Sequence, residues 1–221
     1  MASRLRFQDK VAIVTGGCKG IGRGCVDVFV ANGGKVTVLD IDDAVGETMK
    51  AEGPGEVFYI HCDMTKEEEI QAAVTATVER YHRVDCLVNN AGWHPPSRTI
   101  DGFSADEFRK LLDLNLVGYY LACKGGVVGL TRALATDEGK HGVRVNAISP
   151  GAVRTPLLED CIKDDLQGGL EKCKNSTVLR RVAEPRDIGQ TCLFLAAEAT
   201  FTTGADVSCS AGAELGYGLK Q

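Results

Sequence analysis

Short apolar runs rich in β-branched residues alternate along the chain with longer stretches of helical periodicity. This alternation is typical of a parallel sheet that is covered by helices. The first run is almost wholly apolar, which predicts a strand buried on both faces, and a helix over residues 21–31 follows it and is closed by Asn32 and two glycines. Strands are predicted at residues 10–15, 35–40, 57–62, 85–89, 143–148 and 205–208.

Two capping boxes open further predicted helices. They pair Thr65 with Glu68 and Ser104 with Glu107, and the first of these helices runs to about Tyr81. The strand and helix signals alternate from end to end, so we expect an α/β fold with one doubly wound parallel sheet.

The chain shows no internal repeat, low-complexity tract or linker. We therefore expect a single domain over residues 1–221. Residues 155–182 are polar and read as irregular, which predicts a lid over a site.

Composition and charge exclude several classes of partner. Of 221 residues, 44% are apolar, and 30 acidic against 25 basic residues give a net charge of -5. The two signs are interspersed, which argues against nucleic acid and against an anionic membrane. The first apolar stretch stops at Val14, which is too short for a signal peptide or a membrane span.

The cysteines and histidines form no redox or metal motif. The nine cysteines are odd in number and include no CxxC, so we expect reduced thiols in a cytoplasmic protein. His61, His82, His94 and His141 are scattered without paired ligand spacing, so we expect no metal site.

A glycine-rich turn joins the first predicted strand to the first helix. It begins at Thr15 and Gly16 and ends at Gly20, Ile21 and Gly22. Glycine is needed in a dinucleotide-binding turn because a side chain would keep the backbone away from the pyrophosphate, which rests on the helix amino terminus. The glycines alone would favour a tight turn without a ligand, so other features have to decide.

Asp40 supplies one such feature. It ends the second strand, 24 positions beyond Gly16, where a dinucleotide fold places an acid on the adenosine ribose. A 2′-phosphate about 4 Å from that acid would meet a repulsion of about 4 kcal/mol at an effective dielectric constant of ~20. Lys19 in the turn could attract the same phosphate, but it can swing into water, whereas Asp40 would occupy the position of the hydroxyl's partner. The pattern therefore predicts NAD rather than NADP, unless Asp40 is only a solvated strand end.

The order of motifs along nearly the whole chain resembles that of the short-chain dehydrogenase/reductase family. The resemblance implies a Rossmann-type fold, NAD as cofactor, a small-molecule substrate and a homo-oligomer. The matching motifs are TGGCKGIG (residues 15–22), HCDM (61–64), NNAG (89–92), Asn115, and SPG (149–151) with Thr155.

The same resemblance implies a role for each matching position. His94 would lie near the substrate mouth, although an ordinary loop histidine is an equal alternative. For the cofactor, the resemblance implies Gly16, Lys19, Gly20, Ile21 and Gly22 at the pyrophosphate turn, Asp63 and Met64 at the adenine edge, Asn89, Ala91 and Gly92 along the adenosine, Lys124 at the nicotinamide ribose, and Pro150, Gly151, Val153 and Thr155 at the carboxamide.

The catalytic half departs from the family pattern. The family resemblance implies a tyrosine general acid/base, a lysine four residues later that lowers its pKa, a serine that binds the substrate oxygen, and an asparagine that completes the proton path. Residues 115–124 match the asparagine helix, and residues 125–138 match the tyrosine helix after its lysine. No serine occurs between Ser104 and Ser149, so the serine strand is expected to be missing.

Tyr120 and Lys124 nevertheless have the catalytic spacing and precede two glycines. At i and i+4 they share a helix face, so they can be the catalytic pair. We favour the alternative that both belong to the asparagine helix and that the spacing recurs by chance. On one continuous helix Asn115 lies about 140° from Tyr120 and about 180° from Lys124, so the three converge only if the helix breaks at a glycine.

Taken with the resemblance, these features predict an NAD-dependent oxidoreductase with Asn115, Tyr120 and Lys124 as catalytic residues and with impaired turnover. It would transfer a hydride between the nicotinamide and a secondary alcohol or ketone, either a steroid 17-hydroxyl or an aldose such as L-fucose. The alternatives are a catalytically silent NAD-binding or interaction protein, as a splice or gene-model variant would be, and a misfolded fragment. We expect the sheet to close up by one strand, the stability to be lower and the pairing of subunits to be weaker.

Overall fold

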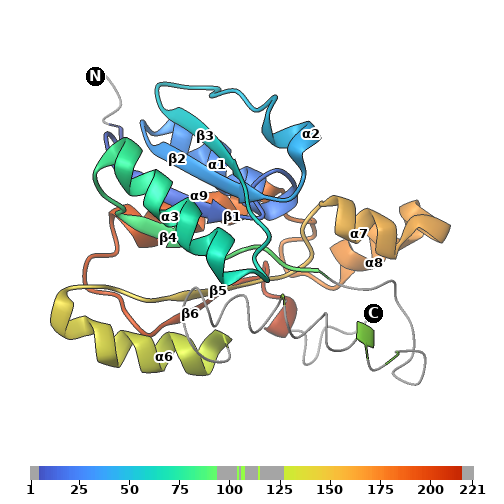
Figure 1. Cartoon of the computed structure of the whole chain (residues 1–221). Coiled ribbons are helices and arrows are strands. Elements are labelled where there is room, and N and C mark those ends of the chain that lie inside the picture. The colour runs from blue at the N-terminus through green and yellow to red at the C-terminus, as the bar shows by residue number, and fades with distance from the viewer. Residues whose placement is uncertain (1–4, 94–103, 105, 108–113, 115–126, 216–221) are drawn as a thin grey trace.

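The computed structural model describes residues 5–93, 104, 106–107, 114 and 127–215 (Figure 1). Six strands and several helices make up this part of the chain. The strands are β1 (Val11–Thr15), β2 (Lys35–Asp40), β3 (Glu56–His61), β4 (Cys86–Val88), β5 (Ala147–Pro150) and β6 (Asp206–Cys209). The α-helices are α1 (Gly20–Ala31), α2 (Asp43–Gly46), α3 (Glu67–Tyr81), α6 (Val127–Glu138), α7 (Pro156–Cys161), α8 (Leu166–Asn175) and α9 (Pro185–Ala197).

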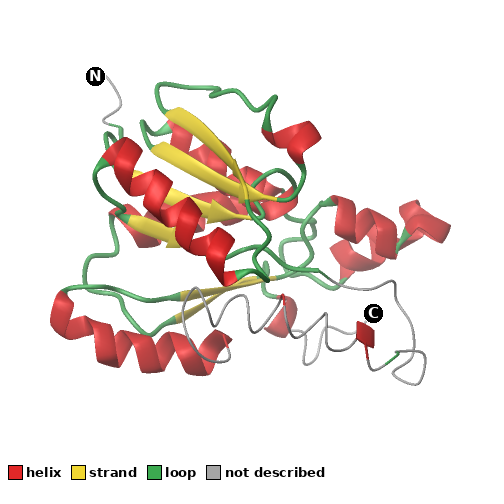
Figure 2. Ribbon diagram, in the orientation of Figure 1, coloured by secondary structure: helices red, strands yellow, loops and turns green. Residues whose placement is uncertain are grey.

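The strands form two separate parallel sheets (Figure 2). The larger has the order β3-β2-β1-β4, and its register pairs Val11 with Lys35 and Ala12 with Cys86. The smaller consists of β5 and β6. Among the described residues, no strand pairs with the outer edge of β4.

The prediction that one sheet would close up by one strand is therefore wrong. Parallel strands are joined by evenly spaced hydrogen bonds, so a short edge offers few of them. β4 has only three residues, and Leu87 at its centre is 42% exposed. β5 pairs with β6 instead and starts at Ala147, four residues later than the predicted strand.

Arg144 and Asn146 explain the late start of β5. The Arg144 guanidinium donates to the carbonyls of Leu195 (2.7 Å) and Ala199 (2.9 Å) at the end of α9. The Asn146 amide donates to the Thr202 carbonyl at 2.9 Å. Leu195 lies in the last turn of α9, where carbonyls have no partner within the helix, and Ala199 and Thr202 lie in the loop after it. These bonds hold the backbone before β5 against α9 and that loop, outside the sheet.

Helices cover both faces of the larger sheet, which confirms the doubly wound α/β fold. Side chains alternate along β1, so that Ala12 and Val14 pack with α1 and α9 while Ile13 packs on the face that carries α3. The five residues of β1 are all buried, as its continuous apolar pattern predicts.

Two glycines bring α1 and α9 into close contact. A Cβ on Gly24 would lie 2.4 Å from the Pro185 backbone, and a Cβ on Gly189 would lie 2.5 Å from the Gly24 carbonyl oxygen. The amino-terminal and carboxyl-terminal parts of the chain therefore pack together without room for an added methyl group.

The two predicted capping boxes have different outcomes. Ser104 and Glu107 form theirs: the Glu107 N–H donates to Ser104 Oγ at 3.1 Å, and the Ser104 N–H donates to Glu107 Oε2 at 3.0 Å. The box of Thr65 and Glu68 is wrong, because α3 begins at Glu67 and the Thr65 hydroxyl donates to Asp63 instead.

The segment over residues 155–182, predicted to be irregular, is largely helical. It contains α7, the 3₁₀ turn Lys163–Asp165 and α8. Both α-helices begin at a side chain that accepts an N–H from the first turn, Thr155 for α7 and Asp165 for α8.

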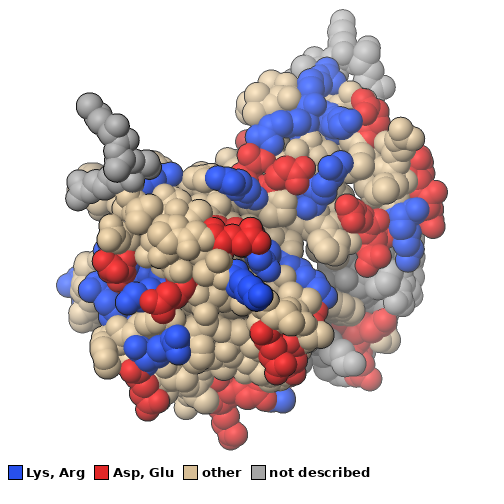
Figure 3. All heavy atoms as spheres, turned by 90° about the horizontal axis from the view of Figure 1, so that it is seen from above, with Lys and Arg blue, Asp and Glu red and all other residues tan. Residues whose placement is uncertain are grey.

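The surface of the described residues carries both signs of charge side by side over the face seen in Figure 3. Within the same residues, no helix combines the length and the apolar content that crossing a bilayer would require.

Candidate functional site

The glycine-rich turn lies at the carboxyl end of β1, where it leads into α1. Gly16 has a φ of +63°, and its N–H donates to the Leu39 carbonyl of β2 at 2.8 Å. A Cβ on Gly22 would lie 2.1 Å from the Gly16 carbonyl oxygen. The turn is thus closed so tightly that a side chain at Gly22 would force it open.

Asn90 holds this turn against the end of β4, a role that the sequence motifs did not assign. Its side-chain amide donates to the carbonyls of Thr15 (3.0 Å) and Gly16 (3.1 Å). The Thr15 hydroxyl in turn accepts the N–H groups of Asn90 and Ala91. Its place inside NNAG, between the predicted residues Asn89 and Ala91, is the signal that could have identified it.

The amino terminus of α1 fits an anionic group. Lys19 is its N-cap residue and makes no side-chain cap hydrogen bond to the first turn. Helix amino termini carry N–H groups without an intrahelical partner and a partial positive charge. Thr155 from the carboxyl-terminal half approaches the same turn, with its Cγ2 3.3 Å from the position of a Cβ on Gly20.

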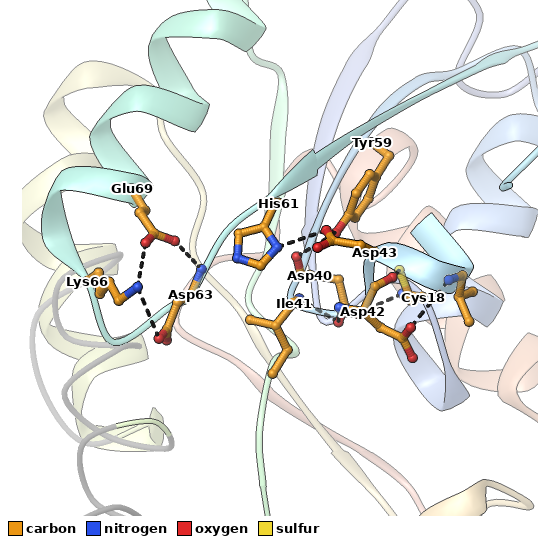
Figure 4. Close-up of polar contacts among 11 residues, drawn as sticks. Cys18, Asp40, Ile41, Asp42, Asp43, Tyr59, His61, Asp63, Lys66 and Glu69 are labelled. Atoms are coloured by element: carbon orange, nitrogen blue, oxygen red, sulfur yellow. Dashed lines mark hydrogen bonds and ion pairs between the residues drawn. The ribbon is translucent and has the colours of Figure 1, made fainter. Parts of the chain in front are cut away.

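Asp40 lies beside the turn at the end of β2, as predicted (Figure 4). Its Oδ2 accepts the Cys18 N–H at 2.9 Å, and its Oδ1 accepts the N–H groups of Ile41 and Asp42 at 2.8 and 3.1 Å. Three backbone donors therefore fix the carboxylate next to the glycines. The arrangement fits an acid that meets a ribose hydroxyl beside a pyrophosphate turn.

Lys19 pairs with an acid beside the turn, while its side chain stays 60% exposed. Its Nζ lies 2.5 Å from Asp42 Oδ2. A hydrogen bond to Asp42 raises the pKa of Lys19, and the same hydrogen bond lowers the pKa of Asp42. Both side chains are therefore charged at neutral pH.

Cys18 is buried between these acids. Burial, with Asp40 nearby, raises the pKa of its thiol to about 12. The thiol is therefore neutral at physiological pH and does not act as a nucleophile.

Asp43 connects the start of α2 to β3. Its Oδ1 lies 2.7 Å from the Tyr59 hydroxyl and 2.8 Å from His61 Nδ1. The Tyr59 hydrogen bond is the main reason why the pKa of Asp43 is lowered. These contacts attach the segment after β2, which carries Asp42, to the neighbouring strand β3.

Asp63 and Met64, predicted at the adenine edge, follow β3. The Asp63 carboxylate accepts the N–H and the hydroxyl of Thr65 at 3.0 and 2.7 Å, and the backbone hydrogen bond lowers its pKa. Lys66 Nζ lies 3.9 Å from the same carboxylate and 2.7 Å from Glu69. The Met64 side chain is buried in the core cluster on the α3 face.

The four residues predicted at the nicotinamide lie at the end of β5 and just after it. Pro150 ends the strand, and a Cβ on Gly151 would lie 2.8 Å from Ser210 Cα. Val153 is buried and forms an isolated bridge with Ala183, while Thr155 caps α7 beside Gly20. The structure therefore brings Thr155 to the glycine turn and places the other three on the chain leading to it.

A cavity of about 460 Å³ lies between the larger sheet and α3. Apolar side chains of β1, β2 and β4 form one wall, and α3 forms the other. The described residues that line it are Ile13, Thr15, Leu39, Met64, Ile70, Gln71, Val74, Thr75 and Leu87.

The predicted catalytic residues Asn115, Tyr120 and Lys124 lie outside the described residues, as does His94. Their roles stay predictions. In the part of the chain that the structure describes, no group of His, Cys, Asp or Glu is arranged to hold a metal ion.

Known proteins match the chain over almost its full length. A family model described as short chain dehydrogenase matches residues 10–123, and one described as enoyl-(acyl carrier protein) reductase matches residues 117–214. The two matches overlap around Tyr120. L-fucose dehydrogenase of Bos taurus is 40% identical over 257 aligned residues, which cover 100% of this chain and 95% of the relative. That alignment is longer than the 221 residues of the chain, in line with a deletion.

Solved structures show the same fold. The ligand-free aldohexose dehydrogenase of Thermoplasma acidophilum has a TM-score of 0.87 and 26% identity, and the alignment covers 99% of each chain. A 3-ketoacyl-(acyl-carrier-protein) reductase of Brucella melitensis, complexed with NADH, has a TM-score of 0.83 and 26% identity over 94% of this chain and 99% of its own. With a family model over more than half of its length and a relative at 40% identity, the chain belongs to the short-chain dehydrogenase family.

Proposed function

We propose that the chain is an NAD-dependent oxidoreductase that acts on a secondary alcohol or ketone and turns over slowly. The observation that carries this proposal is the closed glycine turn beside a fixed carboxylate. Gly22 leaves no room for a side chain against Gly16, and Asp40 is held at the next strand end by three backbone N–H groups. Membership of a dehydrogenase family supports a nicotinamide cofactor, and Asp40 supports NAD over NADP.

Different residues around the turn would bind different parts of the cofactor. The α1 amino terminus would hold the pyrophosphate, Asp40 the adenosine ribose, and Asp63 with Met64 the adenine. Asn89, Ala91 and Gly92 would line the adenosine, and the segment from Pro150 to Thr155 the nicotinamide. The bound nicotinamide would accept or supply the hydride.

Tyr120 would transfer the substrate proton, and Lys124 would lower its pKa. A phenol with a pKa near ~10 is a weak base at neutral pH unless a neighbouring cation stabilises its anion. Asn115 would complete the proton path. The serine that would bind the substrate oxygen has no counterpart between Ser104 and Ser149, which is why we expect slow turnover.

We propose an aldose rather than a steroid 17-hydroxyl as the substrate. L-fucose dehydrogenase and aldohexose dehydrogenase are among the proteins that the chain resembles, which supports a sugar. We further propose that residues 155–182 cover the substrate, because Thr155 at the start of α7 lies beside Gly20 of the glycine turn and because α7 and α8 expose Leu157 and Leu166. Reduced thiols support a cytoplasmic location, and a weakened homo-oligomer is expected.

The test is turnover with NAD and either L-fucose or estradiol, followed by the absorbance of reduced nicotinamide. We expect slow reduction of NAD with L-fucose, loss of activity in Tyr120→Phe and retained activity in the matched control Tyr119→Phe. Equal loss in both variants would contradict the role of Tyr120.

The second candidate is a catalytically silent NAD-binding protein. Two observations favour it: no strand within the described residues pairs with the outer edge of β4, and the serine is missing from the sequence. Both concern the catalytic half and leave the glycine turn intact. Binding of NAD without reaction of either substrate would support this candidate and contradict the enzyme.

A further inference from the structure

Lys19 is the feature of the glycine turn that least fits a site for NAD. A basic side chain beside the adenosine ribose would attract the 2′-phosphate that distinguishes NADP. The structure gives this lysine a partner, because its Nζ lies 2.5 Å from Asp42 Oδ2. The positive charge of Lys19 is therefore paired with a carboxylate before any ligand binds.

Asp42 is held in place by contacts other than Lys19. Its Oδ1 accepts the Val45 N–H at 3.3 Å as the N-cap of α2, and its own N–H donates to Asp40 Oδ1 at 3.1 Å. The Asp42 side chain is 26% exposed, whereas that of Lys19 is 60% exposed. The carboxylate is thus the fixed partner, and the flexible lysine comes to it.

We propose that Asp42 is a second determinant of cofactor choice, which neutralises Lys19 and so prevents it from binding an adenosine 2′-phosphate. The inference rests on the proposed NAD site. Asp40 would repel the phosphate directly, and Asp42 would remove the one cation of the turn that could offset that repulsion.

The net charge of Lys19, Asp40 and Asp42 gives the direction in which the ligand preference should shift when Asp42 is replaced. Asp40, Lys19 and Asp42 together carry a net charge of -1, and removal of the Asp42 charge leaves zero with Lys19 unopposed. A phosphate monoester carries close to two negative charges at neutral pH. Loss of the Asp42 charge should therefore favour ligands with a 2′-phosphate over those with a 2′-hydroxyl.

The variant Asp42→Asn tests this with little risk to the fold. Asparagine is as good an N-cap residue as aspartate, so the bond from the Val45 N–H can persist. Binding of AMP, adenosine 2′,5′-bisphosphate, NAD and NADP to the full-length chain would be measured by calorimetry. We expect the preference for the 2′-phosphate member of each pair to rise by about tenfold, which corresponds to ~1.4 kcal/mol.

Two further variants separate the pairing from a general change in charge. Asp43→Asn removes the same charge one residue away, where the carboxylate contacts Tyr59 and His61 instead of Lys19. Asp42→Asn combined with Lys19→Met lacks the lysine that the proposal requires. Both should shift the preference by less than Asp42→Asn alone.

Each outcome decides between the claims. An unchanged preference in Asp42→Asn, or an equal shift in Asp43→Asn or in the double variant, would overturn the role of Asp42 while AMP and NAD still bind. If AMP binds and NAD does not, the proposed function is contradicted. The role of Asp42 is then still tested by comparing AMP with adenosine 2′,5′-bisphosphate. Binding of none of the four ligands would overturn both.

Discussion

The two sheets of this chain differ in how completely they are enclosed. All five residues of β1 and the central four of β2 are buried, with α1 and α9 on one face and α3 on the other. In β5 only Ala147 is buried, and β6 alternates between exposed and half-buried residues. A parallel strand becomes part of a core only where strands flank it and helices cover it.

The difference in enclosure between the two sheets coincides with the segment that the chain lacks relative to the family pattern. The glycine turn, Asp40 and Asn90 all depend on the four-stranded sheet, and each is held by several hydrogen bonds. The serine expected between β4 and β5 is missing, and this is where the two sheets separate. Cofactor binding thus depends on the enclosed four-stranded sheet, whereas catalysis depends on the region where the serine is missing. This predicts that NAD binding is retained better than turnover.

The largest expected effect is on turnover. We predict that kcat/KM with NAD and L-fucose lies at least about 10²-fold below that of the bovine relative, because removal of one hydrogen-bond donor to a developing oxyanion costs about that much. Both proteins would be assayed side by side by the absorbance of reduced nicotinamide. Equal rates would show that the missing serine strand is dispensable.

A substitution inside the turn should have the next largest effect. Gly22→Ala places a Cβ 2.1 Å from the Gly16 carbonyl oxygen, so we expect NAD affinity to fall by at least about tenfold and the free energy of unfolding by about 1–3 kcal/mol. Calorimetry and denaturant unfolding would measure the two changes. The matched control is Gly129→Ala in α6, where an added Cβ meets no atom of the described residues within 4 Å, and it should leave affinity unchanged.

Core substitutions compare the two sheets directly. Val38→Ala in β2 removes methyl groups from a fully buried site and should lower the free energy of unfolding by about 2–3 kcal/mol. Val207→Ala in β6, where the side chain is half-buried, should cost less than about 1 kcal/mol. Equal costs in denaturant unfolding would contradict the difference in enclosure.

The smallest expected effect is on the stability of the folded chain at acidic pH. Backbone hydrogen bonding from Thr65 lowers the pKa of Asp63 in the folded chain, so the stability it contributes is complete above the unfolded value of about 3.9 and is lost as the pH falls through the lower folded value. Asp63→Asn should therefore weaken the dependence of stability on pH below about pH 4 and not above pH 6. An unchanged acid profile would argue against this contribution.

The sequence predicts the amino-terminal half well for physical reasons. β1 is apolar except for Thr15 because both its faces are covered, and the glycines of the turn are required by backbone contact, so each leaves a local pattern. Asp40 is found at the strand end where spacing places it.

The carboxyl-terminal half is harder to predict because its structure depends on distant partners. Residues 143–146 look like the start of a strand, but Arg144 and Asn146 bind the end of α9 and the loop after it, and no local pattern reveals these partners. α7 has only six residues, and α8 carries Gly168 and Gly169 in its interior, so the local preference of both segments for a helix is weak. The sequence does not predict the Lys19 pairing, because Asp42 lies beyond the strand that carries Asp40.

Titration of the purified full-length chain with NAD, followed by calorimetry and by thermal unfolding, tests the central claim most directly. The account predicts saturable heat and a higher unfolding midpoint, because a ligand that binds only the folded state stabilises it. Both effects should be reduced in Gly22→Ala and retained in Gly129→Ala. Absence of heat and of stabilisation with the unaltered chain would contradict the claim that its intact four-stranded half binds NAD.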